Sequence, residues 1–195
     1  QLPFFAIKIK LEEWNQALSI LERMGLQAAA VTSPLKSVAF QSCFQTTDRA
    51  KELGALNTLV RNQGKWFGDN TDWEGFQHIL KNHEILKCAS VVVWGGGGTL
   101  QMIKSLLPNS QTFSSRSIQL PMEHFEILIW AGNPLSDLPP LSWSPSCIVD
   151  LNYREDSRAR EYAQLVSAKY ISGEGLFKRQ ASVQQEFWNK FRSGG

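Results

Sequence analysis

Residues 91–103 read VVVWGGGGTLQMI, and this stretch decides the fold class of the second half of the chain. A short apolar run bounded by turn residues is typical of a strand buried in a parallel sheet. The residues after the glycines, TLQMIKSLL, predict a short helix. In a turn between such a strand and such a helix, glycine permits a tight chain reversal, leaves room for a pyrophosphate against the backbone and exposes the N–H groups of the helix.

The glycine pattern by itself is a weak signal. Gly95 and Gly97 occupy the first two positions of G-x-G-x-x-G, but the third falls on Leu100, so a flexible joint is the alternative to a dinucleotide site. A joint does not need a buried strand on one side and a helix on the other, and this context favours nucleotide binding. Leu100 is expected to crowd the helix against the strand, and with the bulk of Trp94 it predicts weaker binding than the glycines alone indicate.

The segment after the next expected strand indicates which nucleotide would bind. An acidic residue there would select NAD, but the chain has Ser115, Arg116 and Ser117. An arginine at this place suits the 2′-phosphate of NADP. The alternative is that Arg116 is one more solvated surface charge.

Outward from the glycines, apolar runs alternate with helical periodicities, which predicts an α/β fold. A hairpin is expected in residues 55–70, where two apolar runs flank Asn62, Gln63 and Gly64. The other expected strands are residues 4–10, 27–33, 89–94, 111–115, 125–131 and 147–153. The expected helices are residues 11–25, 73–85, 99–107, 157–168 and 178–191.

The composition argues against several classes of partner. The 195 residues include 20 basic and 18 acidic side chains with no long block of either sign, so nucleic acid is not an expected partner. No apolar segment reaches the roughly 20 residues that span a bilayer, so no membrane is expected either. The cysteines are far apart in the sequence: Cys43, Cys88 and Cys147. Isolated, reduced thiols of this kind suit a cytoplasmic protein.

The histidines do not predict a metal site. All three lack partners at the spacing of metal ligands: His78, His83 and His124. We interpret them as surface or partly buried side chains.

Three polar clusters in the first half each end or interrupt an apolar run: VTSPLK at 31–36, GALNTL at 54–59 and GDNTD at 68–72. Polar clusters at strand ends of an α/β domain face a common edge, so Lys36, Asn57 and Asp72 are expected to converge on one small molecule. The alternative for Lys36 and Asp72 is a surface ion pair, which contributes only about 0–1 kcal/mol.

Together with DLNY at 150–153 and GEGLFKRQA at 173–181, these clusters resemble the shikimate dehydrogenase family from the first residues nearly to the last. The resemblance implies an α/β fold of two domains. These are an N-terminal substrate-binding domain, residues 1–82, and a reduced Rossmann-like NADP-binding domain, residues 83–177. Residues 178–195 would form a C-terminal helix that packs back on the first domain. It also implies a small-molecule substrate. We expect a monomer or homodimer, which the cysteines place in the cytoplasm, and no metal, because the histidines lack ligand spacing.

The resemblance carries roles onto matching residues. In V-T-x-P-x-K and D-N-T-D it implies that Lys36 and Asp72 are the catalytic pair. The implied substrate contacts are Thr32, Asn57, Tyr153 and Gln180. The implied cofactor contacts are Gly95, Gly96, Gly97, Gly98, Thr99, Ser115, Arg116, Ser117, Leu151 and Gly173.

The implied reaction is the NADPH-dependent, reversible reduction of 3-dehydroshikimate to shikimate in chorismate and aromatic amino-acid biosynthesis. A lysine ammonium beside the carbonyl stabilises and protonates the alkoxide that hydride transfer leaves, and a carboxylate holds the ammonium in place. Two alternatives stay open: a related binding protein with little or no turnover, and a dehydrogenase for quinate or amino-substituted shikimates.

The chain departs from the family in both halves. It lacks S-x-S-P-x-x-H, whose serines bind the substrate carboxylate, and the asparagine of the family's N-V-T is Ala30 here. We expect either a truncated enzyme or a sequence that begins about one βα unit late, as the missing methionine suggests. The segment SIQLPMEHF at 117–125 is too short for the family's helix and strand, and AGNPLSDLPP at 131–140 replaces a longer loop. We therefore expect a thinner wall near the adenine.

Overall fold

The computed structural model describes residues 5–87, 90–117, 125–133, 135 and 137–192 of the chain. The chain divides into two compact units, residues 1–71 with 182–195 and residues 72–181. The division falls after Thr71, whereas the predicted substrate domain ran to residue 82. The assignment of substrate and cofactor to separate domains stays a prediction.

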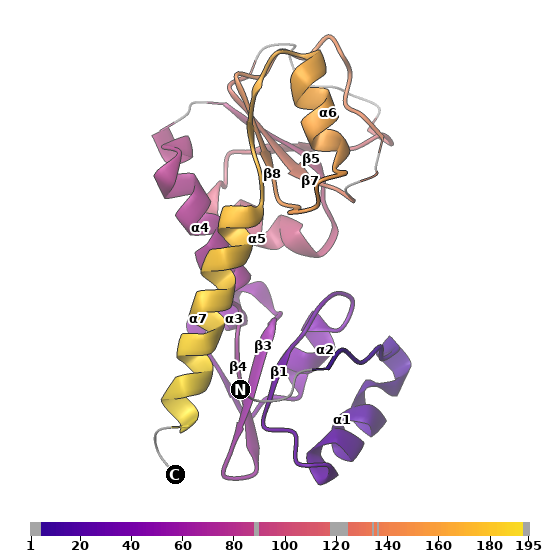
Figure 1. Ribbon diagram of the computed structural model, residues 1–195, viewed down its shortest axis with the longest axis vertical. Coiled ribbons are helices and arrows are strands. Elements are labelled where there is room, and N and C mark those ends of the chain that lie inside the picture. The colour runs from indigo at the N-terminus through magenta and orange to yellow at the C-terminus, as the bar shows by residue number, and fades with distance from the viewer. Residues whose placement is uncertain (1–4, 88–89, 118–124, 134, 136, 193–195) are drawn as a thin grey trace. The chain divides into compact units, whose positions relative to one another are not determined.

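The first unit is built on a four-stranded sheet of order β1-β3-β4-β2 (Figure 1). Its strands are β1 (Ala28–Ala30), β2 (Gln45–Thr46), β3 (Thr58–Asn62) and β4 (Lys65–Asp69). Its helices are η1 (Leu11–Glu13), α1 (Trp14–Arg23), α2 (Lys36–Gln41) and α3 (Asp48–Leu53). The core lies between the sheet and these helices and includes Trp14, Leu56, Leu59 and Trp66.

The predicted hairpin is confirmed. Strands β3 and β4 pair antiparallel from Thr58 opposite Asp69 to Asn62 opposite Lys65. The two residues between them, Gln63 and Gly64, both have positive φ, at 49° and 75°. This is the conformation of a type I′ turn, which matches the twist of the strands it joins.

The predicted strand at residues 4–10 is wrong for the residues that the structure describes, because 5–10 lie outside any helix or strand. Alternation of apolar and polar residues makes a strand only where a partner strand supplies hydrogen bonds and a core face. Here the apolar side chains of Phe5 and Ile7 are exposed.

No helix or strand was predicted between residues 34 and 54, but this polar segment contains α2, β2 and α3. The short helix α3 is defined by its ends: the Thr47 side chain accepts a hydrogen bond from the N–H of Ala50, and Gly54 closes the helix in the left-handed region. Local caps of this kind form short helices that apolar periodicity does not indicate.

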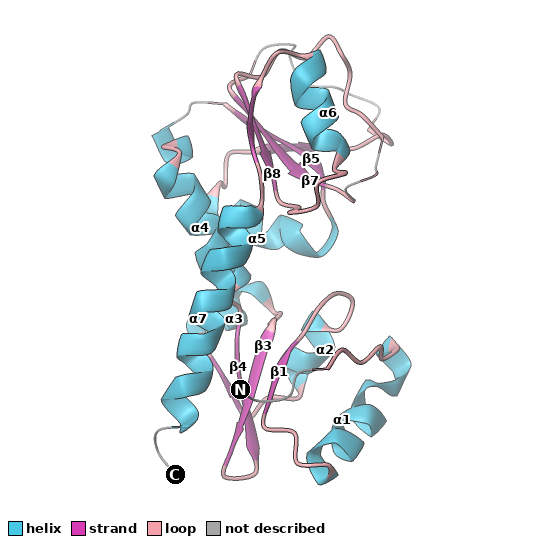
Figure 2. Ribbon diagram, in the orientation of Figure 1, coloured by secondary structure: helices cyan, strands magenta, loops and turns pink. Residues whose placement is uncertain are grey.

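The second unit contains a five-stranded parallel sheet of order β6-β5-β7-β8-β9 (Figure 2). Its strands are β5 (Val91–Gly95), β6 (Gln111–Phe113), β7 (Ile127–Ala131), β8 (Cys147–Asp150) and β9 (Lys169–Ile171). This order is doubly wound, with the switch point beside β5, and it confirms the predicted Rossmann-like sheet. The short edge strand β9 was not predicted.

Two helical segments of the second unit, α4 and η2, precede its first strand, and the others follow strands. They are α4 (Asp72–Asn82), η2 (Ile85–Lys87), η3 (Gly97–Thr99), α5 (Leu100–Leu106), α6 (Arg158–Leu165) and the start of α7 (Glu174–Arg192). Helix α6 packs Ala159, Tyr162 and Ala163 into a core with Val92 and Trp94 of β5. Because side chains alternate along a strand, Val93 faces the opposite side of the sheet.

The C-terminal part of α7 belongs to the first unit, as predicted for the last helix. The Gln184 amide donates to Thr58 Oγ1 at 2.9 Å, and the Trp188 indole N–H donates to the carbonyl of Leu59 at 2.9 Å. Within the described residues, no helix has the length and hydropathy that a bilayer crossing requires.

Candidate functional site

The glycine turn follows β5 at the switch point of the parallel sheet. Gly95 has φ +93°, and a Cβ added there would meet the backbone nitrogen of Gly132 at 2.5 Å. Gly97 has φ +74°. Gly95 therefore requires glycine for its backbone conformation and for the close approach of Gly132, and Gly97 requires it for its backbone conformation alone.

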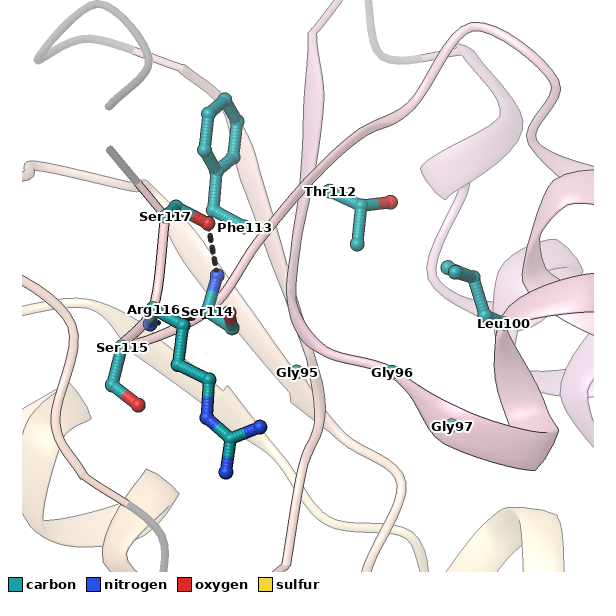
Figure 3. Close-up of a pocket in the computed structure, with 10 residues that line it drawn as sticks. All are labelled: Gly95, Gly96, Gly97, Leu100, Thr112, Phe113, Ser114, Ser115, Arg116 and Ser117. Carbon is teal, nitrogen blue, oxygen red and sulfur yellow. Dashed lines mark hydrogen bonds between the residues drawn. The ribbon is translucent and has the colours of Figure 1, made fainter. Parts of the chain in front are cut away.

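A pocket of about 370 Å³ opens between this turn and the turn after β6 (Figure 3). Gly95, Gly96 and Gly97 line one side, and the segment from Ser114 to Ser117 lines the other. The predicted residues Gly98 and Thr99 do not line it; they lie in η3, where the Thr99 hydroxyl donates to the carbonyl of Gly96 at 3.3 Å. The structure thus joins two predicted cofactor segments at one site.

The turn after β6 is closed by its own serines. The N–H of Ser114 donates to Ser117 Oγ at 2.8 Å, and the N–H of Arg116 donates to Ser114 Oγ at 3.3 Å. Arg116 is exposed at the tip of this turn, and within the described part of the chain no carboxylate forms an ion pair with it. Figure 3 shows its side chain extending away from the turn, so the guanidinium is available to an anion.

Two further residues define the wall of the pocket. Leu100 lies 3.8 Å from the position that a Cβ on Gly96 would take, and the buried Thr112 hydroxyl has no hydrogen-bond partner among the described residues. Trp94, expected to add bulk here, lies instead in the core with α6 and donates its indole N–H to the carbonyl of Asp137 at 2.8 Å. Trp94 is not among the residues that line the pocket.

The first two polar clusters of the first unit are hydrogen-bonded to each other. The N–H of Val31 donates to the carbonyl of Asn57 at 2.8 Å, and the N–H of Leu56 donates to the carbonyl of Lys36 at 3.1 Å. Lys36 is the first residue of α2, and Thr32 is exposed just before it. The structure therefore places the chain segments of Thr32, Lys36 and Asn57 together.

The third cluster binds to the second through the Asn57 side chain. Asn57 Oδ1 accepts hydrogen bonds from the N–H of Thr71 at 2.8 Å and from the Thr58 hydroxyl at 2.9 Å. Asn70 Nδ2 donates to the carbonyl of Ala55 at 3.0 Å. Asn57 is 4% exposed, so its amide holds the loop that leads into Asp72. Asp72 begins the second unit, and its pairing with Lys36 stays a prediction.

Asp69, the first residue of DNTD, holds this loop in place, a role that the sequence did not single out. Its carboxylate is buried and accepts bonds from Arg49 Nε at 2.7 Å, from Arg49 Nη2 and from the Thr47 hydroxyl at 2.6 Å. Burial by itself raises the pKa of Asp69, but the hydrogen bonds and charge of Arg49 and the Thr47 bond outweigh it and leave the pKa below its ordinary value. The ion pair fixes the end of β4 and so the start of the N-T-D loop.

In the second unit, the loop after β8 carries two of the predicted residues. The N–H of Leu151 donates to the carbonyl of Trp130 at 3.0 Å, and the ring of Tyr153 stacks on Phe177 of α7 with centroids 4.4 Å apart. The N–H of Gly173 donates to the carbonyl of Asn152 at 3.0 Å. The structure thus brings Leu151, Tyr153 and Gly173 together.

Gln180 lies further along α7. A Cβ added to Gly75 of α4 would meet the Cβ of Gln180 at 3.2 Å, so α4 and α7 pack closely at this point. Its role as a substrate contact stays a prediction.

Two of the histidines border a second cavity, of about 410 Å³. His78 lies in α4 and His83 just beyond it, and His78 Nε2 is 2.9 Å from Asn82 Nδ2. Burial, with the charges of Lys169 and His78, lowers the pKa of His83. No group of three potential metal ligands occurs in the described ranges, and His124 lies outside them.

The chain is similar to shikimate dehydrogenases over nearly its whole length. The family model described as "Shikimate dehydrogenase substrate binding domain" matches residues 2–59. A shikimate dehydrogenase (NADP(+)) of Colwellia psychrerythraea is 30% identical over 218 residues, covering 92% of this chain and 78% of that protein. One of Xanthomonas campestris is 39% identical over 108 residues, which cover 54% of this chain and 38% of that protein.

Solved structures have the same fold. A shikimate 5-dehydrogenase of Thermus thermophilus, solved with NADP(H) and shikimate, aligns with a TM-score of 0.78 at 23% identity over 93% of this chain and 80% of that one. The enzyme of Aquifex aeolicus aligns with a TM-score of 0.77 at 24% identity over 93% of this chain and 79% of that one.

Proposed function

The chain belongs to the shikimate dehydrogenase family, and from this premise we propose that it catalyses the NADPH-dependent, reversible reduction of 3-dehydroshikimate to shikimate. The observation that carries the proposal is the pocket of the second unit, where Arg116 stands opposite the glycine turn without a carboxylate partner in the described residues. The named relatives, which are NADP(+) enzymes, support the same cofactor. The product is an intermediate on the way to chorismate and the aromatic amino acids.

The residues of this pocket fit NADP. The positive φ of Gly95 and Gly97 and the close approach of Gly95 to Gly132 leave a turn without side chains, as a pyrophosphate requires. The Arg116 guanidinium would hold the 2′-phosphate through charge-assisted hydrogen bonds, and Ser115 and Ser117 would add hydroxyl donors. When bound, NADPH supplies the hydride. Leu151 and Gly173, at the carboxyl end of β8 and before α7, would contact the nicotinamide end.

An Arg116→Gln variant tests the cofactor assignment. Loss of a hydrogen bond to a charged group, about 1.5–3 kcal/mol, predicts a KM for NADPH roughly ten- to a hundredfold higher, with the KM for NADH little changed. Arg154→Gln is a matched control, because Arg154 is exposed and pairs with Asp156 away from the pocket. Equal effects on the two cofactors would contradict the role of Arg116.

On the substrate side, we propose that Lys36 is the proton donor and that Asp72 positions its ammonium. Reduction of the ring ketone leaves an alkoxide, which the Lys36 ammonium stabilises and protonates as it forms. In the reverse direction, neutral Lys36 takes the proton of the alcohol. Thr32, Asn57, Tyr153 and Gln180 are proposed to bind the hydroxyls and carboxylate of the substrate, with Asn57 also holding the loop before Asp72.

A Lys36→Ala variant tests the chemistry by loss of NADPH absorbance with 3-dehydroshikimate. We expect kcat to fall by about 10²- to 10⁴-fold, the usual contribution of general acid–base catalysis. Lys51→Ala is the control, because Lys51 is an exposed lysine of the same unit, paired with Asp48. Full activity of the Lys36 variant would exclude its proposed role.

Substrate choice and turnover are tested with the same assay. Quinate and amino-substituted shikimates distinguish the proposed reaction from that of related dehydrogenases. Absence of turnover with every substrate, together with retained NADPH binding, would favour a binding protein of the same family.

We also propose a cytoplasmic location and a monomeric or homodimeric state. The wide spacing of Cys43, Cys88 and Cys147 in the sequence supports isolated thiols and a reducing compartment. Light scattering of the purified chain measures the oligomeric state directly.

A further inference from the structure

Tyr153 and Phe177 form an aromatic pair that faces solvent. Tyr153 follows β8, and Phe177 lies in the first turn of α7. Their ring centroids are 4.4 Å apart and the rings are tilted by 31°. The side chains are 60% and 42% exposed, so the pair is not part of either core.

The backbone that leads to Tyr153 is held rigidly. Asp150 is buried, and its Oδ1 accepts hydrogen bonds from the N–H and the Nδ2 of Asn152, each at 2.9 Å. Its Oδ2 accepts a bond from the Tyr170 hydroxyl at 2.9 Å. Asn152 Nδ2 also donates to the carbonyl of Gly132 at 3.2 Å. These bonds end one residue before Tyr153.

The Tyr153 side chain has one aromatic contact among the described residues, the ring of Phe177. No hydrogen bond of its hydroxyl occurs among the residues that the structure describes. The stack therefore fixes the direction of the ring while the hydroxyl stays available to a ligand. A tyrosine on an exposed loop would otherwise sample several rotamers.

Phe177 is well placed to hold that ring. Its N–H donates to the carbonyl of Gly173 at 2.9 Å, which fixes the first turn of α7. Gly173 in turn donates to the carbonyl of Asn152 at 3.0 Å. Loop and helix are thus joined by backbone bonds on one side and by the aromatic stack on the other.

We propose that Phe177 is a positioning residue of the enzyme, which stacks on Tyr153 and aims its hydroxyl at a hydroxyl or carboxylate of the substrate. This inference rests on the proposed function, in which Tyr153 contacts the substrate. Ordering the ring before binding removes a cost of about 0.5–1.5 kcal/mol per immobilised side chain, which corresponds to a KM about two- to tenfold lower. Phe177 does not touch the substrate in this role.

The kinetic test separates a positioning role from a structural one. We expect Phe177→Ala to raise the KM for 3-dehydroshikimate about two- to tenfold, with kcat and the KM for NADPH nearly unchanged, and Phe177→Tyr to restore the low KM. Because Phe177 acts through the Tyr153 hydroxyl, Phe177→Ala should have no further effect in a Tyr153→Phe background. Leu165→Ala on α6 is the control, an exposed apolar side chain outside the pair.

A spectroscopic test does not depend on turnover. The chain has three tyrosines, so labelling with 3-fluorotyrosine gives three ¹⁹F resonances, and Tyr153→Phe assigns one of them. We expect Phe177→Ala to shift the Tyr153 resonance by removing the ring current, and shikimate to move it in the wild-type protein. An unmoved Tyr153 resonance in Phe177→Ala, or an unchanged KM in that active variant, overturns the inference. An inactive wild-type protein overturns the proposed function instead.

Discussion

At the scale of single residues, Gly173 and Gly175 are two positions apart at the start of α7 but have opposite surroundings. A Cβ on Gly173 would meet the carbonyl oxygen of Asn152 at 2.6 Å, whereas a Cβ on Gly175 would be 3.9 Å from Ile79 Cγ1. Backbone atoms cannot yield to the new methyl group, so Gly173→Ala is expected to cost about 1–3 kcal/mol of unfolding free energy. Urea denaturation of the variant and the wild-type protein measures this change in unfolding free energy.

The matched variant Gly175→Ala should have the opposite sign. Gly175 lies within α7 in ordinary van der Waals surroundings, and alanine is favoured over glycine in a helix by about 0.5–1 kcal/mol. Equal losses of stability in the two variants would contradict the close approach at Gly173.

Asp69 makes the stability of the first unit depend on pH. Its folded-state pKa lies below the ordinary value of 3.8, so the stabilisation is present above that value and is lost as the pH falls through the folded-state pKa. Asp69→Asn should lower the unfolding free energy at neutral pH, because Arg49 loses its charged partner. The variant should also flatten the loss of stability below about pH 4.

Urea titrations at about pH 6 and about pH 3 measure both effects. Glu12→Gln changes an exposed carboxylate of the same unit and is the control. A variant that keeps the full acid dependence would exclude Asp69 as its source.

At the scale of elements, the hairpin of β3 and β4 has a turn residue that can be improved. Gln63 has φ +49° ahead of Gly64 in a type I′ turn, where asparagine is preferred because it tolerates the left-handed region better. Gln63→Asn is expected to raise the unfolding free energy. Thermal unfolding measures the gain.

The neighbouring position supplies the contrast. Gly64 has φ +75°, so Gly64→Ala should be strained and destabilising although no atom lies within 4 Å of the added Cβ. If Gln63→Asn and Gly64→Ala both raised the unfolding free energy, the turn would not be of type I′.

Elements with strong local signals were predictable from sequence. The hairpin was predictable because two apolar runs and Gly64 lie within 16 residues of one another. The glycine turn was predictable because the apolar run Val91–Trp94 precedes it and the helix-forming residues TLQMI follow it. The strand expected at residues 4–10 was wrong, because alternation of side chains does not supply a partner strand. Helices α2 and α3 were missed because six residues give too little periodicity.

At the scale of the whole molecule, the proposed cofactor should stabilise the protein by linkage. A ligand that binds only the folded state adds about 2.7 kcal/mol when its concentration is 100 times Kd. We expect NADP to raise the melting temperature more than NAD at equal concentration. Arg116→Gln should remove the difference between the two nucleotides. In the absence of nucleotide, the variant and the wild-type protein should have the same melting temperature.

An equal shift with both nucleotides in the wild-type protein would contradict the proposed selectivity. No shift with either would mean that Leu100 and the shortened segment after Arg116 leave a turn that does not hold the cofactor.

The sequence by itself determined the fold class, the hairpin and the glycine turn, and its motifs carry the roles proposed for Lys36, Asp72 and Arg116, because these features are encoded in short patterns of residue type. The tertiary structure decided that Trp94 faces the core, that Asp69 pairs with Arg49, and that Phe177 stacks on Tyr153. These pairings join residues 20 or more positions apart in the chain. Which of two distant side chains meet depends on how strands and helices pack, and no local spacing records it.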